Sequence, residues 1–342
     1  GGAAAAAGAA GLTAADSLFD VVAAGAEYTN GRGRNGITTA KPKRGGHLNV
    51  GVASEQQGFS PAAGRLDGAG FVLARTVFDP LMAVTATGKC VPYLAESLTS
   101  NKDHTKWTIT VRPNIKFHDG TPLDGEALYV NLDKEYKSPL TGVAIQPNVE
   151  SYEVTGPRSL TITMKRPWTE FAYTLAAQQI CFTAAPSMLN SPDGGTTHPI
   201  GTGPFVFEQW IPNDHFNVRA NKSYWRKGLP YLDSITFKPI PDEQARAQAL
   251  RAGTIDLMVA FSADTMLEFR GNKQWSYADD TGKMVGSPNV SCVMLNTSKA
   301  PFDDIEARRI VATGTSSAAF SKTMDKGLGG AVNGIYQPGS PY

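Results

Sequence analysis

The residues whose types could do chemistry are spread along this chain of 342 residues without forming an enzyme signature. The sequence contains no GxSxG nucleophile elbow, no HExxH zinc motif and no GxxxxGK[ST] phosphate loop. Residues 31–36 read GRGRNG and satisfy the pattern GxGxxG. No predicted strand precedes them and no predicted helix follows, so dinucleotide binding is not expected there.

The cysteines and histidines, which could bind metals, are also dispersed along the chain. The three cysteines, Cys90, Cys181 and Cys292, have no CxxC spacing, and the five histidines form no pair at helical metal-site spacing. At most one disulfide could form, and each cysteine is expected to pack as a small apolar side chain. We therefore expect no metal site and no cofactor.

The length of the chain predicts two or more lobes, and its composition fits a loop-rich α/β protein. Hydrophobic residues make up 41% and aromatic residues 9% of the chain, enough for a folded core. The 35 glycines and 22 prolines predict many turns. Thirty-two basic and 31 acidic residues leave a net charge of +1, which gives no reason to expect a nucleic-acid partner.

The N-terminal region is predicted to direct export. Residues 1–26 are rich in Ala and Gly and lack a basic start, and we interpret them as the remnant of a signal peptide cleaved after Ala26. The alternative is a disordered tail. The composition is typical of twin-arginine signals, and no cysteine precedes Cys90 that could carry a lipid anchor. Residues 27–44 are polar and glycine-rich and predict a flexible leader.

Alternation and helical spacing predict the elements that follow. We expect a strand over 47–52 and a helix through Phe71 and Phe78 that ends at Asp79-Pro80. Hairpin strands are expected around Trp107–Val111 and again at Ile115 and Phe117. Thr121-Pro122 is expected to open a helix, and alternation over 160–164 predicts another strand.

The later segments predict a hairpin and a parallel unit. Residues 205–211 and 215–219 flank a Pro-Asn-Asp turn, which favours a hairpin. Residues 235–240 and 255–260 are expected to be strands, joined by a helix that Asp242 caps and Gly253 ends. Short joints between them imply a parallel crossover. The four tryptophans Trp107, Trp168, Trp210 and Trp225 are expected to fill the core.

Several sequence blocks, taken in order over residues 45–342, resemble the family-5 extracellular solute-binding proteins. The blocks are GGHLNVG at 45–51, FDPL at 78–81, PYLAES at 92–97, WTITVR at 107–112 with IKFHDGTP at 115–122, GTGPF at 201–205, NKSYW at 221–225, PYLD at 230–233, ALRAGTID at 249–256 and PFDD at 301–304. One block would be weak evidence, but a collinear series is specific.

The resemblance implies an α/β, periplasmic-binding-protein-like two-lobe clamp of type II, with mixed sheets and an extra subdomain. Lobe one would comprise residues 45–80 and 191–292, and the extra subdomain residues 81–190. Residues 293–342 would begin a second lobe that is incomplete in this chain, so residues 1–342 alone are expected to bind ligand poorly.

The resemblance also implies the function. A monomeric, non-enzymatic periplasmic protein would capture di- or oligopeptides and deliver them to ABC permease subunits. Ser54, Glu55 and Gln56 occupy the position of the family's ligand-pairing loop, and Asn289 and Ser291 are further ligand-binding candidates. Glu55 would accept hydrogen bonds from a ligand ammonium or amides, or else be a solvated loop carboxylate. Nickel chelates or small glycosides as ligands, and a secreted hydrolase on a similar scaffold, are the alternatives.

Overall fold

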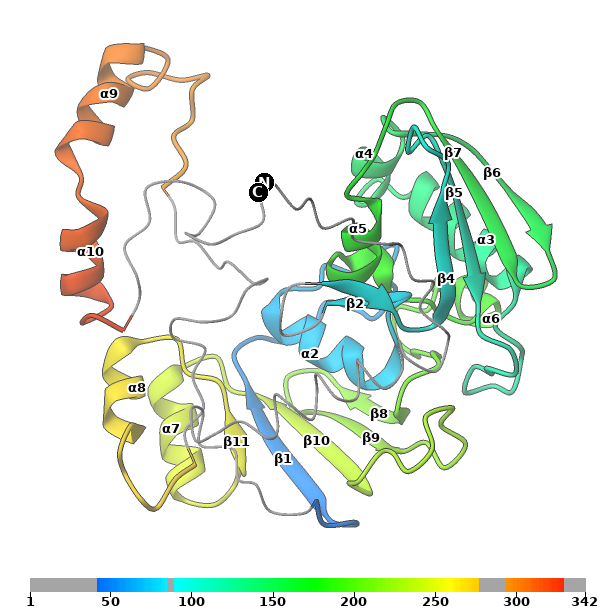
Figure 1. Ribbon diagram of the computed structural model, residues 1–342. Helices are drawn as coiled ribbons and strands as arrows, with labels where there is room; N and C mark the ends of the chain where they lie inside the picture. Colours follow the sequence, from blue (N-terminus) through cyan, green and yellow to red (C-terminus); the bar gives the residue numbers. More distant parts are fainter. Residues whose placement is uncertain (1–41, 85–88, 277–292, 329–342) are drawn as a thin grey trace, which may run out of the picture. The chain divides into compact units, whose positions relative to one another are not determined.

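A computed structural model describes residues 42–84, 89–276 and 293–328 of the chain. In this part, the chain forms two compact units (Figure 1). The first contains residues 42–84 and 90–259, and the second contains residues 89, 260–276 and 293–328. The first unit thus holds the described residues of the predicted lobe one up to 259, together with those of the predicted extra subdomain apart from Lys89. The division between lobe one and the extra subdomain stays a prediction.

A mixed five-stranded sheet organises one part of the first unit. Its order is β11-β1-β10-β9-β8, with β1 parallel to both β10 and β11 and the remaining neighbours antiparallel. The strands are β1 (His47–Val52), β8 (Phe205–Ile211), β9 (His215–Ala220), β10 (Ser234–Pro239) and β11 (Leu257–Met258). The predicted 205–219 hairpin is therefore confirmed as β8 and β9.

The predicted strand–helix–strand unit is also confirmed, with β1 inserted between its two strands. Helix α7 (Glu243–Arg251) connects β10 to β11, and the Asp242 side chain caps it by accepting a hydrogen bond from the amide of Ala245. Gly253 follows the helix with φ of +71°, a conformation that costs glycine little. Because β10 and β11 both run parallel to β1, the carboxyl ends of these three strands lie at the same edge of the sheet.

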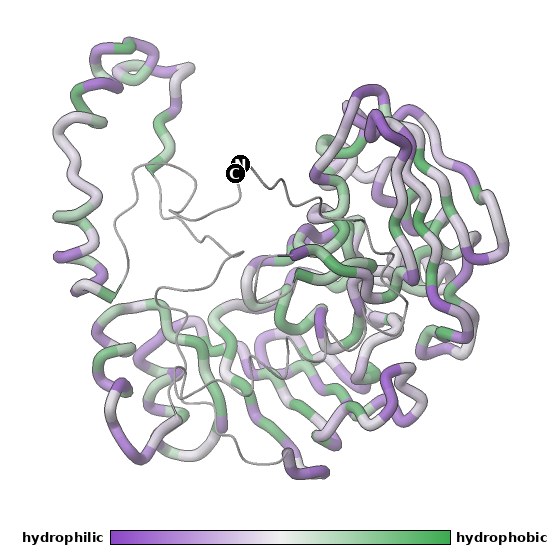
Figure 2. Tube along the Cα trace, in the orientation of Figure 1, coloured by the Kyte–Doolittle hydropathy of each residue, from purple (hydrophilic) through white to green (hydrophobic). Residues whose placement is uncertain are grey.

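A four-stranded antiparallel sheet with the order β4-β5-β7-β6 organises the other part of this unit. Its strands are β4 (Ala95–Ser100), β5 (Lys106–Val111), β6 (Val149–Gly156) and β7 (Ser159–Met164). Alternate residues of β5 and β7 are buried, as the alternation predicted: Trp107, Ile109, Val111, Leu160, Ile162 and Met164. Figure 2 shows apolar segments along the strands and polar residues at the turns between them.

Two local predictions in this region are wrong. Ile115 and Phe117 are buried but form no strand, because the chain turns at Gly120 and folds back so that the Phe117 amide donates to the Thr121 carbonyl. Helix α3 (Gly125–Lys137) does not begin at Pro122. Asp124 is its N-cap and accepts a hydrogen bond from the amide of Ala127.

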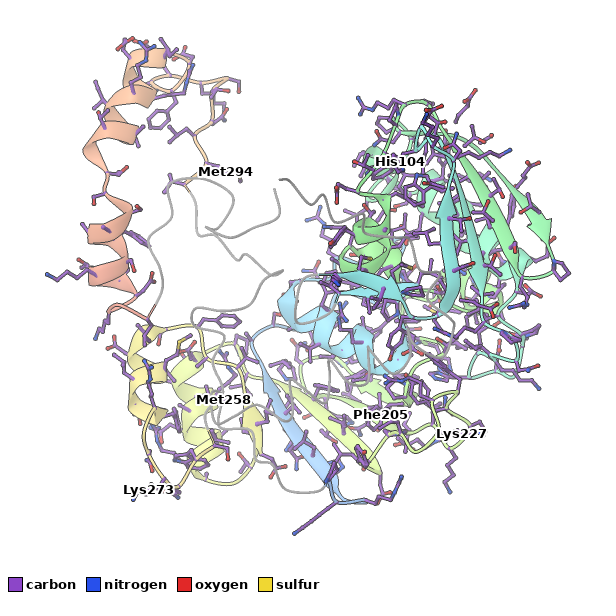
Figure 3. All side chains as sticks on the ribbon, in the orientation of Figure 1. His104, Phe205, Lys227, Met258, Lys273 and Met294 are labelled. Atoms are coloured by element: carbon purple, nitrogen blue, oxygen red, sulfur yellow. The ribbon has the colours of Figure 1, made fainter. Side chains whose placement is uncertain are left out.

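Helices and short strands complete the first unit. Helix α2 ends at the predicted place, before Asp79-Pro80. These elements are α2 (Gly68–Val77), β2 (Met82–Val84), β3 (Cys90–Pro92), α4 (Gly142–Ile145), α5 (Phe171–Ala177), η1 (Gln179–Cys181) and α6 (Pro186–Leu189). One contiguous hydrophobic core joins them to both large sheets. Phe205 of β8 is buried, whereas Lys227 in the loop after Trp225 is exposed (Figure 3).

The second unit is helical where it is described. It contains α8 (Ala263–Phe269), α9 (Ile305–Gly314) and α10 (Ser317–Met324). Ile305 and Ile310 of α9 are 51% and 70% exposed, whereas Val311 is half-buried. None of the described helices is long and apolar enough to cross a membrane.

Candidate functional site

The candidate loop containing Ser54, Glu55 and Gln56 leaves the carboxyl end of β1. The turn between β8 and β9 lies at the same edge, because β9 runs antiparallel to β10, which is parallel to β1. In open α/β sheets, ligands bind in crevices outside the carboxyl ends of the strands. The loop is therefore placed where the fold class puts its binding sites.

Each of the three candidate side chains in this loop makes a contact within the protein. The Ser54 hydroxyl donates to the Asp67 carboxylate, which also caps α2. Gln56 is buried and its side-chain amide donates to the main-chain carbonyl of Gly58. The half-buried Glu55 accepts from the indole N–H of Trp210 at 2.8 Å and from the main-chain N–H of Asn213 at 2.9 Å.

The main-chain groups of the same loop are unpaired within the described ranges. Among the described residues, the amide and carbonyl groups of Ser54, Glu55 and Gln56 have no hydrogen-bond partner. The next main-chain anchor is Phe59, whose amide donates to the Thr196 carbonyl. Unpaired main-chain donors and acceptors are the groups that an extended peptide can pair with. The other two candidates, Asn289 and Ser291, lie outside the described residues.

Sequence analysis missed a buried carboxylate beside this sheet. Asp79 is 2% exposed, and its oxygens accept from the Tyr224 hydroxyl at 2.9 Å, the Trp225 indole at 2.8 Å and the Thr202 hydroxyl at 3.2 Å. Burial raises the pKa of Asp79 to about 6, against the lowering effect of these three hydrogen bonds. The FDPL, GTGPF and NKSYW blocks that contribute these residues thus meet around one carboxyl group.

Two further blocks join the same cluster. Tyr93 of the PYLAES block accepts a hydrogen bond at its hydroxyl from Arg226, 2.8 Å away, and lies 3.2 Å from the Tyr224 hydroxyl. His118 of the IKFHDGTP block accepts from the Gly201 amide at Nδ1 and donates from Nε2 to the Gly203 carbonyl. Burial lowers the pKa of His118, in keeping with a neutral ring in these roles.

The glycines of the GTGPF block allow close contact with α2. A Cβ atom at Gly203 would lie 2.5 Å from the main-chain carbon and oxygen of Val77, and one at Gly201 would lie 2.2 Å from that oxygen. A cavity of about 420 Å³ adjoins this cluster and is lined in part by Arg75 and Arg226. The cluster is built as a structural junction, since every oxygen of Asp79 is used by the fold.

Thiols and metal ligands give no sign of redox or metal chemistry in the part of the chain that the structure describes. Cys90 and Cys181 are free thiols there, and burial raises the pKa of Cys90 to about 11 and that of Cys181 to about 12. No group of three or more His, Cys, Asp or Glu side chains in the described ranges could hold a metal ion. Of the four tryptophans, Trp107 is buried as expected, while Trp168, Trp210 and Trp225 are half-buried.

A comparison with protein families identifies the chain. Residues 89–342 match the model for bacterial extracellular solute-binding proteins, family 5, middle region. This match extends over most of the chain. The chain belongs to this family.

Individual family-5 relatives agree with this assignment. The chain is 27% identical over 274 residues to the glutathione-binding protein GsiB of Salmonella paratyphi A, a match that covers 79% of this chain and 52% of the relative. It is 26% identical over 276 residues to GsiB of Escherichia coli O1:K1. The chain thus spans about half the length of the curated relatives it matches.

Solved structures show the same family-5 fold. The periplasmic binding protein DppA of Helicobacter pylori, in complex with the peptide STSA, is 21% identical with a TM-score of 0.67 over 83% of this chain and 59% of that one. The oligopeptide-binding protein AppA of Bacillus subtilis, in complex with a nonapeptide, is 23% identical with a TM-score of 0.65, covering 84% and 57%. NikA of Brucella suis, in complex with Fe(III)-EDTA, is 24% identical with a TM-score of 0.67, covering 86% and 59%. The fold is therefore that of the periplasmic binding proteins, as the motif blocks predicted.

Proposed function

We propose that this family-5 chain is the substrate-binding component of an ABC importer that captures small peptides. The observation that carries the proposal is the family match over residues 89–342. The named ligands of its relatives support peptides in particular, since they include glutathione, a tetrapeptide and a nonapeptide.

The loop at the carboxyl end of β1 supports a peptide ligand on physical grounds. Its main-chain groups at Ser54, Glu55 and Gln56 have no partner among the described residues. An extended peptide can pair with such groups in the manner of an added strand, without its side chains being read. We propose these residues as ligand contacts, with Asn289 and Ser291 contributing from the segment that leads to the second lobe.

The mechanism we propose is a two-lobe clamp in which a bound peptide contacts both lobes and shifts the hinge equilibrium toward the closed state. Lobe one would comprise residues 45–80 and 191–292, residues 81–190 the extra subdomain, and residues from 293 onward lobe two. The closed monomer would then dock on the membrane permease subunits. Export to the periplasm by the twin-arginine route, with cleavage near Ala26, completes the proposal.

Titration calorimetry on the protein as its gene encodes it tests this function. The panel should contain glutathione, tripeptides, longer peptides, a nickel chelate and small glycosides, with mass spectrometry of each mixture afterwards. We expect saturable heat with one peptide per protein and an unaltered peptide. Saturation by the chelate or a glycoside alone would replace the ligand class, and a cleaved peptide would favour the hydrolase alternative.

A further inference from the structure

The carboxylate of Glu55 is used to join two segments that lie far apart in the chain. One oxygen accepts from the Trp210 indole and the other from the Asn213 amide, so the loop after β1 is attached at both oxygens to the β8–β9 hairpin. These two bonds fix the place of the carboxylate, although each of its oxygens keeps a further acceptor site. Bonds to an ionised acceptor are stronger than neutral ones, so the attachment of the loop to the hairpin is strong.

Aromatic packing supports the hairpin side of this attachment. Phe59, on the same loop, stacks on Phe216 of β9 with ring centroids 4.5 Å apart and meets Trp210 edge-on at 5.1 Å. Phe59 is 1% exposed, which ties the loop to the core just beyond the candidate residues. The short segment from Ser54 to Gln56 therefore lies between β1 and this aromatic cluster.

We propose that Glu55 is a positioning residue whose contacts to Trp210 and Asn213 hold the loop so that its main chain, and not its carboxylate, contacts the ligand. Trp210 thereby becomes an affinity-determining residue that does not touch the ligand. This inference rests on the proposed peptide-binding function. It follows from the contrast between the engaged side chains of Ser54, Glu55 and Gln56 and their unpaired main-chain groups.

A double-mutant cycle between Glu55→Ala and Trp210→Phe, made in the full gene product, tests the proposal. The dissociation constant for a tripeptide is measured by calorimetry for the wild type, both single variants and the double variant. We expect Glu55→Ala to weaken binding about tenfold, since it releases both attachments and the ligand must then order the loop. Trp210→Phe should weaken it about threefold, and should add nothing in the Glu55→Ala background.

A matched control separates this effect from loss of indole packing. Trp168 packs on Phe171 at 5.3 Å, away from the loop, and Trp168→Phe should leave the dissociation constant unchanged. The same titrations with the N-acetylated tripeptide distinguish positioning from direct capture. If Glu55 only positions the loop, acetylation changes the affinity of wild type and Glu55→Ala by the same factor.

The opposite pattern would overturn the proposal. Direct capture of the ammonium requires that Glu55→Ala weaken binding of the free peptide and leave binding of the acetylated peptide unchanged. Failure of the wild type to bind any peptide would instead refute the proposed function. Hydrogen exchange in the ligand-free protein then decides on the attachment itself: faster exchange of the Asn213 and Phe59 amides in Glu55→Ala supports it, and unchanged exchange of both amides refutes it.

Discussion

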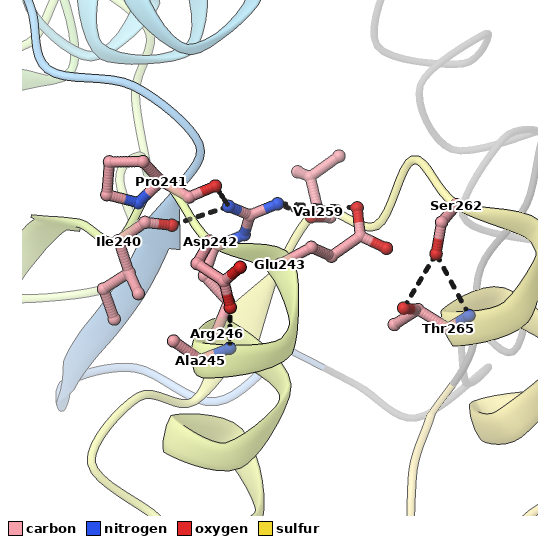
Figure 4. A network of polar contacts seen from close by, with 9 residues as sticks. All are labelled: Ile240, Pro241, Asp242, Glu243, Ala245, Arg246, Val259, Ser262 and Thr265. Carbon is pink, nitrogen blue, oxygen red and sulfur yellow. Dashed lines mark hydrogen bonds and ion pairs between the residues drawn. The ribbon is translucent and has the colours of Figure 1, made fainter.

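Arg246 is expected to be a principal stabilising residue at the carboxyl edge of the five-stranded sheet. Its side chain is 1% exposed and donates from Nη1 to the carbonyl of Ile240 at 2.6 Å and to that of Pro241 at 2.9 Å (Figure 4). From Nη2 it reaches the Val259 carbonyl at 3.5 Å and the Glu243 carboxylate at 3.6 Å. It thus links the end of β10 to Val259, the last residue of the first unit.

Replacing Arg246 by methionine keeps most of the stem and removes the guanidinium. Hydrogen bonds to a charged group contribute about 1.5–3 kcal/mol each, so the two short bonds to Ile240 and Pro241 amount to roughly 3 kcal/mol at the low end. Against this, Nε is buried with no partner among the described residues, and its removal returns about 1 kcal/mol. We expect Arg246→Met to lower the free energy of unfolding by about 2 kcal/mol.

Urea denaturation measures this loss, and Arg251→Met provides the matched control. Arg251 lies in the last turn of the same helix and is exposed, so its replacement should change the free energy of unfolding by less than about 0.5 kcal/mol. Arg246→Lys should also be less stable than the wild type, because an ammonium group cannot reproduce the planar, two-pronged hydrogen bonding of the guanidinium. Wild-type stability of Arg246→Met would refute the reasoning and show that the desolvation of the charge offsets its hydrogen bonds.

Three further predictions concern residues of the first unit, the last with a control residue in the second unit. Burial raises the pKa of Glu135 to about 8, above its ordinary 4.5, so the folded state holds a proton that the unfolded chain releases, and stability should fall as pH rises between these values. Glu135→Gln should flatten that part of the stability–pH curve in urea melts, and an unaltered slope would assign it to another group. Asp79→Asn should lower the free energy of unfolding at neutral pH by about 2 kcal/mol, because the amide keeps one acceptor oxygen in place of two and at least one of the three buried donors loses its bond; an unchanged denaturation midpoint would contradict this. Gly203→Ala should cost about 3 kcal/mol through its clash with the main chain of α2, whereas Gly314→Ala, with open space around its Cβ, should be neutral or slightly stabilising; equal melting temperatures of the two variants would refute the steric argument.

Local patterns alone were sufficient to predict much of the secondary structure and the family. Asp242 before an amphipathic stretch and Gly253 after it define helix α7 through interactions within one turn, and the alternation along β5 and β7 needs only the period of the strand. The start of α3 shows the limit. Pro122 and Asp124 both suit a helix N-terminus, and the fold uses Asp124 because Pro122 is engaged in a bridge with Lys116.

Contacts between distant segments were decided only by the tertiary structure. The position of Glu55 in the sequence marks a loop carboxylate, but its partner Trp210 lies 155 residues away and reaches it only because the sheet order brings the β8–β9 turn to the carboxyl end of β1. In the same way, Asp79 reads as a helix stop, and its burial among Thr202, Tyr224 and Trp225 depends on how the motif blocks fold together. A side chain's type and its neighbours in sequence determine what it can bond, whereas the packing of the sheets determines which partner is within hydrogen-bonding distance.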